Sequence, residues 1–105
     1  MNEEINIYAC LDYIRDNAKK YAQAKANRVY LEEYRKSLKA TLMATQIGEP
    51  VNAREIYAYA HHDYTILLEG IKEAIAEEEN LRWKLIAAQA KISVWQSLGA
   101  NERAE

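Results

Sequence analysis

The chain has few residues that interrupt a helix, and their positions determine how long its helices can be. Its 105 residues include one proline, Pro50, and three glycines, Gly48, Gly70 and Gly99. Gly48 followed by Pro50 is typical of a helix end with a turn, because glycine readily adopts the left-handed conformation there and proline cannot continue the helix. No glycine or proline precedes Gly48. The sequence therefore predicts one long helix before this turn and another after it.

Capping signals and the remaining glycines suggest where each helix begins and ends. Asn2 can cap the first helix, with two acidic residues in its first turn. Asn52 begins an Asn-Ala-Arg-Glu stretch that is typical of a capping box. Gly70 is tolerated inside a helix at a cost of about 1 kcal/mol relative to alanine, and Gly99 is expected to end the last helix. The expected elements are a long helix over about residues 3–46, a short helix over about 53–60 and a long helix over about 64–98.

The strongest periodic pattern lies in the second long helix. Apolar positions alternate in spacing between four and three residues, which is the pattern of a coiled-coil seam. One polar residue, Glu78, interrupts the pattern, and a single polar residue at such a position fixes register or pairs with a buried Lys, Arg or Tyr. A helix of this length needs a partner along its seam. The seam positions are Leu67, Ile71, Ala74, Glu78, Leu81, Leu85, Ala88, Ile92 and Trp95.

The first long helix carries two apolar stripes. Counted at 100° per residue, they lie on nearly opposite sides of one helix. Either the helix breaks near residues 22–27 or its two halves face different partners, and the strong helix formers of residues 21–26 favour the second alternative. One half would then pack on the last helix and the other on a second subunit. The stripes are Ile7, Leu11, Ile14, Ala18 and Tyr21, and Leu31, Tyr34, Leu38 and Leu42.

These patterns predict an all-α fold in a single domain over residues 1–105. Two long amphipathic helices would form an antiparallel coiled-coil-like hairpin with a short connecting helix. Further apolar residues outside the seam, Trp83, Ile86 and Val94, exceed what one interface can bury. We therefore expect hairpins to associate into a helical bundle, with a two-fold dimer as the commonest arrangement.

Composition limits the compartment and the partners. The net charge of −2 argues against strong non-specific attraction to nucleic acid or anionic membranes. Cys10 is the only cysteine, so it cannot form an intramolecular disulfide, and we interpret it as a small helix residue rather than a redox sensor. No apolar segment is long enough to span a membrane, and the acidic N-terminus lacks a signal core. We expect a cytoplasmic protein that does not bind membranes.

No pattern in the sequence indicates catalysis, a cofactor or a metal. His61 and His62 are adjacent, so they point about 100° apart on a helix and cannot chelate one metal as an i, i+4 pair would. We expect them to form a polar helix junction, with Asp63 capping the helix that follows. In the acidic run 77–79, two residues should be solvated, whereas Glu78 falls on the seam. We therefore predict a non-enzymatic protein without cofactors.

The segment Arg15–Lys39 is basic and leaves two interpretations open. Several cations share one helix face, with Tyr21, Tyr30 and Tyr34 interleaved, and such a face can follow a phosphate backbone. However, Glu32 lies within the same face, so a solvated ladder of i, i+4 ion pairs explains the pattern equally well. The candidate nucleic-acid-binding residues are Lys25, Arg28, Arg35, Lys36 and Lys39.

Two stretches carry a resemblance to a known group of proteins. Residues 21–37 (YAQAKANRVYLEEYRKS) and 81–92 (LRWKLIAAQAKI), the latter followed by Val94 and Trp95, resemble small uncharacterised α-helical proteins of bacteriophages and prophages. Such proteins are often encoded near recombination and replication functions, so the resemblance implies an accessory role in DNA metabolism. It supplies no catalytic or binding residues. The leading interpretation is a homo-oligomeric interaction protein that also contacts a phage or host protein. The alternative is a DNA-binding accessory to phage recombination or replication.

Overall fold

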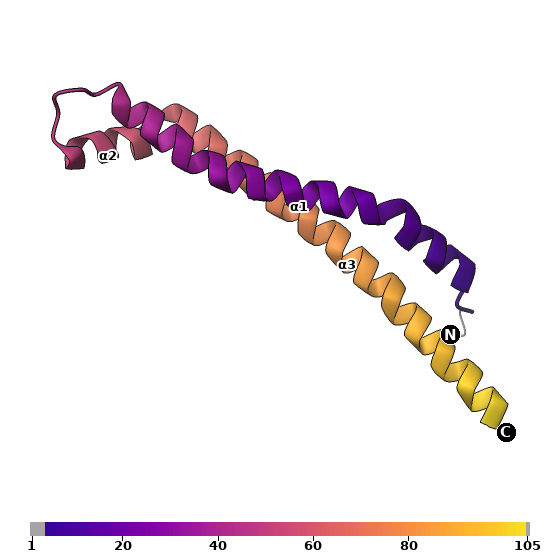
Figure 1. The fold of residues 1–105 in the computed structure, drawn as a ribbon. Helices are drawn as coiled ribbons and strands as arrows, with labels where there is room; N and C mark the ends of the chain where they lie inside the picture. Colours follow the sequence, from indigo (N-terminus) through magenta and orange to yellow (C-terminus); the bar gives the residue numbers. More distant parts are fainter. Residues whose placement is uncertain (1–3, 105) are drawn as a thin grey trace. The chain divides into compact units, whose positions relative to one another are not determined.

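The fold consists of three helices that follow one another along the chain. The computed structural model describes residues 4–104. They form α1 (Ile7–Ala44), α2 (Val51–Ala60) and α3 (His62–Ala104), which Figure 1 colours in this order from indigo to yellow. The described residues contain no strand. The predicted all-α class is confirmed, as is the plan of two long helices with a short helix between them.

Contacts group the chain into two compact units. The first consists of the described parts of Met1–Gln23 and Glu78–Glu105, and the second is Ala24–Glu77. Each unit pairs a segment of α1 with a segment of α3, and the second also contains α2. The hairpin pairing of the two long helices is thus present within each unit.

The second unit has a small core where its three helices meet. Leu42, Ala58 and Tyr64 are buried there, one from each helix, and Leu38 packs against them. Farther along the same pair of helices, Leu38 and Leu67 line one groove. Residue numbers rise along α1 as they fall along α3, so the two segments are antiparallel.

The end of α1 forms as the glycine and proline predict. Helix α1 stops at Ala44, and Gly48 has a φ of +95°, in the left-handed region that favours glycine. Arg54 of α2 donates a hydrogen bond from Nε to the carbonyl oxygen of Met43 at 3.1 Å. The same carbonyl oxygen also accepts the Gln46 backbone N–H at 3.1 Å, so the Arg54 bond is a second one to this oxygen, and it connects α2 to the end of α1.

The helix starts differ from the predictions. Asn2 lies outside the described residues, and Asn6 is the cap of α1, because its Oδ1 accepts a hydrogen bond from the Ala9 N–H at 3.0 Å. The capping box at Asn52 is wrong. Pro50 precedes the first residue of α2, and no side chain caps that helix. Pro50 is itself the N-cap, with a φ of −58° and a ψ of 152°, and its carbonyl oxygen accepts the Arg54 N–H at 3.0 Å, so the helix begins directly after it.

The predicted end of α3 at residue 98 is also wrong, because the helix continues through Gly99 to Ala104. Gly99 keeps a helical φ rather than the left-handed conformation that ends a helix. Ala100, Glu102 and Arg103 are good helix formers that offset the unfavourable propensity of one glycine.

Burial along α3 follows the predicted seam over most of its length. Leu67, Ile71, Ala74, Glu78 and Ala88 are buried, and the seam positions Leu81, Leu85 and Ile92 are half-buried. Trp95 is the exception, with 45% of its surface exposed. Glu4, the first described residue, lines one pocket together with Ile5 and Lys91. The N-terminal segment that packs beside α3 is thus described only as far as Lys91. No helix of residues 4–104 in this unit therefore faces Trp95.

The two opposed stripes predicted for α1 are wrong, although the helix is continuous through residues 22–27 as expected. Leu11, Ala18 and Tyr34 are exposed. The less exposed positions instead follow one seven-residue repeat. Counting apolar residues alone does not find this repeat, because the polar residues Asn17 and Arg28 belong to it. A seven-residue repeat rotates by about 20° per heptad around a straight helix, and supercoiling of the two helices removes this rotation. The repeat comprises Ile7, Cys10, Ile14, Asn17, Tyr21, Ala24, Arg28, Leu31, Leu38 and Leu42.

Candidate functional site

Most of the predicted nucleic-acid-binding residues are held in ion pairs. An Arg28 guanidinium nitrogen lies 2.9 Å from the Glu32 carboxylate, and Lys36 Nζ lies 3.2 Å from that of Glu33. These are the i, i+4 and i, i+3 contacts of a solvated ladder. Lys25 and Arg35 are exposed and form no ion pair with any described residue. The basic face is thus partly neutralised along its own helix.

Lys39 is engaged from outside its own helix. Its Nζ lies 3.8 Å from Glu55 Oε1 and 4.8 Å from the centroid of the Tyr59 ring, both on α2. The pKa of Lys39 is raised above its ordinary value of 10.5, chiefly because its ammonium group donates a hydrogen bond to the Tyr59 hydroxyl, with Glu55 adding attraction. This lysine is therefore fixed in place and fully charged at neutral pH.

The three C-terminal cations of this set surround a pocket in the second unit. We call it the cationic pocket; its volume is about 310 Å³. Tyr59 and Tyr64 form the rest of its wall and pack edge to face, with ring centroids 5.3 Å apart and an interplanar angle of 83°. The pocket contains only hydrogen-bond donors and phenol groups. Its lining is Arg35, Lys36, Lys39, Tyr59 and Tyr64.

Sequence reasoning did not find Tyr59 and Tyr64. They belong to α2 and to the first turn of α3, and they reach the basic face only because α2 folds back against the end of α1. The sequence shows tyrosines near a turn, but not which helix face they meet.

The histidine pair forms a helix junction, as predicted, but the expected cap residue is wrong. His61 caps α3, because its Nδ1 accepts a hydrogen bond from the Asp63 backbone N–H at 3.0 Å. This bond requires a tautomer with the proton on Nε2. The Tyr57 ring packs edge-on against His61, with ring centroids 5.6 Å apart. No group of three His, Cys, Asp or Glu residues among those described is arranged to hold a metal ion.

A second surface feature of the same unit is apolar. Tyr30 and Tyr34 stack on α1, with ring centroids 6.2 Å apart. Tyr34 also lines a groove of about 260 Å³ with Leu38, Asp63, Ile66 and Leu67. Tyr34 and Ile66 remain 44% and 54% exposed. We call this surface, together with Tyr30, the tyrosine groove. It shares no side chain with the cationic pocket.

Two other predicted packing residues lie in the first unit. Trp83 is 59% exposed, and its indole N–H donates to Glu79 Oε2 at 3.0 Å. Tyr21 is half-buried on the repeat of α1. Of the acidic run, Glu78 is buried and takes part in an interaction, whereas Glu77 and Glu79 are exposed, as predicted.

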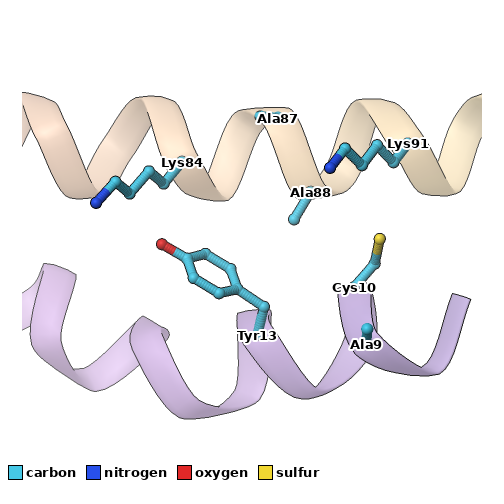
Figure 2. Close-up of a pocket in the computed structure, with 7 residues that line it drawn as sticks. All are labelled: Ala9, Cys10, Tyr13, Lys84, Ala87, Ala88 and Lys91. Carbon is cyan, nitrogen blue, oxygen red and sulfur yellow. The ribbon is translucent and has the colours of Figure 1, made fainter. Parts of the chain in front are cut away.

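Cys10 lies in the interface between the helix segments of the first unit. Figure 2 shows its thiol pointing across the interface towards α3, close to Ala88. The small side chains of Ala9, Ala87 and Ala88 line this part of the interface, and Lys84 and Lys91 of α3 line it as well. The cysteine is buried and free, so packing accounts for it as the sequence suggests.

Comparisons with protein-family models, with curated protein sequences and with solved structures found no match to this chain. Within residues 4–104, none of the helices has the length and apolar character needed to cross a bilayer. The function must therefore be argued from the surfaces themselves, and the cationic pocket and the tyrosine groove are the two that the second unit offers.

Proposed function

We propose that this chain is a non-enzymatic helical interaction protein that pairs with a second copy of itself. The observation that carries the proposal is how its apolar surface is distributed. Across the described residues no large side chain is fully buried, whereas many large apolar side chains are exposed. Where exposed apolar side chains gather, as Tyr34 and Ile66 do around one groove, they are typical of an interaction site.

The tyrosine groove is the surface best suited to this pairing. Its rings come from one helix and are already stacked, so little side-chain freedom is lost when a partner covers them. Aromatic side chains beside an apolar depression are typical anchors of protein interfaces. A second copy supplies the same rings and the same groove. In a two-fold dimer, the tyrosine rings of each copy can pack into the groove of the other.

The resemblance to small phage and prophage proteins extends this proposal to a biological setting. We propose that the pair acts as an accessory in phage biology by contacting a phage or host protein. The exposed apolar residues of the first unit, such as Trp83 and Leu98, are available for that contact.

Sedimentation equilibrium at micromolar concentration tests the pairing. We expect a species of twice the 12.1 kDa chain mass. Ile66→Glu should reduce this to the mass of one chain, because it places a charge in the tyrosine groove. Thr65→Glu is the matched control, since it adds the same charge to the neighbouring exposed residue and should leave the dimer intact. A wild-type protein that sediments as a single chain would refute the proposal.

A further inference from the structure

The cationic pocket has the composition of an oxyanion site. Its lining residues are one arginine, two lysines and two tyrosines, and no acidic residue is among them. A guanidinium group and phosphate oxygens match in geometry and form paired hydrogen bonds. At 310 Å³ the pocket is at the small end of ligand sites, which usually span about 300–1,000 Å³. It suits a phosphate group and its immediate attachments.

The donors are partly organised in advance. Lys39 Nζ lies 4.8 Å from the centroid of the Tyr59 ring and 3.8 Å from Glu55 Oε1, so its ammonium group is held beside α2. A phenol hydroxyl such as that of Tyr59 can donate its O–H to a ligand. Arg35 is exposed and has no ion-pair partner among the described residues, so its five N–H donors are available.

We propose that the cationic pocket binds the phosphate groups of a nucleic-acid strand. A strand fits better than an isolated phosphate, because a further exposed cation, Lys25, lies along α1 in the same unit. Recognition rests on the backbone rather than on the bases. Lys39 covers one face of the Tyr59 ring, and Tyr64 is almost fully buried, so the tyrosines offer hydroxyls more readily than open stacking faces.

Two carboxylates compete with this ligand. Glu55 lies 3.8 Å from Lys39, and Glu33 lies 3.2 Å from Lys36. A bound phosphate must displace or share these partners. Removing the negative charge of Glu55 should therefore strengthen binding. If DNA were attracted only by the overall charge of the protein, removing any acidic residue would have the same effect.

Fluorescence anisotropy with a labelled oligothymidylate at low salt tests the proposal. We expect the wild-type protein to bind, and Arg35→Gln combined with Lys36→Gln to weaken binding at least tenfold. The same pair of changes should lower the slope of log K against log salt by about 1.4, because each contact to a single strand contributes about 0.7. Glu55→Gln should raise affinity. Oligoadenylate should give the same result, since the backbone is what is read.

The matched control is Lys19→Gln combined with Lys20→Gln. It removes the same charge from exposed positions of α1 in the first unit and should leave affinity within about twofold. Circular dichroism melting checks that the variants are folded. No binding by the wild type, an equal loss in both double variants, or unchanged affinity in Glu55→Gln would overturn the proposal. Binding of inorganic phosphate without binding of the oligonucleotide would overturn the assignment to a strand.

Discussion

His61, which caps α3, stabilises the fold through a hydrogen bond and a ring contact, and substitutions at this position can measure the two contributions separately. His61 makes two contacts that its substitution removes: the 3.0 Å hydrogen bond from the Asp63 N–H to Nδ1, and the edge-on contact with Tyr57 at 5.6 Å. Losing a side-chain cap costs about 1 kcal/mol, and losing a ring contact of this kind costs about 0.5 kcal/mol. His61→Ala should therefore lower the free energy of unfolding by about 1.5 kcal/mol.

Two further substitutions at His61 divide this loss. Asparagine is a strong cap but has no ring, so His61→Asn should lose only the ring contribution of about 0.5 kcal/mol. Phenylalanine keeps a ring and cannot accept a hydrogen bond, so His61→Phe should lose about 1 kcal/mol.

Thermal unfolding followed by circular dichroism measures these differences. For a chain of this size, 1 kcal/mol corresponds to a shift of about 4 °C in Tm. His62→Ala is the control, because the His62 side chain is exposed and takes no part in the cap. The reasoning is refuted if His61→Asn is as unstable as His61→Ala, or if His62→Ala shifts Tm as much as His61→Ala does.

Three other substitutions test the interior and the charge pair. Leu85→Asp should lower the free energy of unfolding by about 3 kcal/mol, because it puts an unpaired charge in the seam; a melting curve equal to that of the wild type would contradict the hairpin packing. Glu78→Leu should lower the midpoint of urea unfolding, because Glu78 is 6% exposed and engaged in an interaction that leucine cannot make; an unchanged midpoint would show that this interaction adds nothing to stability. The pKa of Lys39 is raised by Tyr59 and Glu55, so its stabilising effect is complete below pH 10.5 and is lost as pH rises through the raised value. Lys39→Met should reduce the alkaline loss of stability, and an alkaline profile identical to that of the wild type would show that Lys39 contributes nothing to it.

Sequence predicts the packing of α3 better than that of α1 because the two helices encode their seams differently. On α3 almost every seam position is apolar, and the alternation of four and three residues marks the buried side without a structure. On α1 the repeat includes Asn17, whose side chain donates to the Tyr13 carbonyl oxygen at 2.9 Å, and the partly buried Arg28. An apolar count skips such positions and selects exposed neighbours such as Leu11 in their place.

The exposure of Trp95 and the composition of the cationic pocket could not be predicted from the sequence, because both depend on which helix segments pack against each other. Trp95 fits the seam pattern perfectly, but burial also needs a helix opposite, and α1 begins only at Ile7. The cationic pocket depends on α2 folding back against α1, so that Tyr59 and Tyr64 reach Lys39. The basic residues were visible in the sequence, whereas the two tyrosines that complete the pocket were not.

The thin interior gives a physical reason to expect a partner. Small residues fill many positions of the two seams, among them Ala24, Ala74 and Ala88, and polar residues occupy others. Because the hydrophobic contribution scales with the apolar area buried, at about 25 cal/mol per Å², such seams stabilise a hairpin less than leucine-rich ones do. Several large apolar side chains lie outside the seams, with Trp83 and Ile66 more than half exposed. Covering that surface with a second copy would add the burial that the single hairpin lacks, so folding stability and self-association should be coupled.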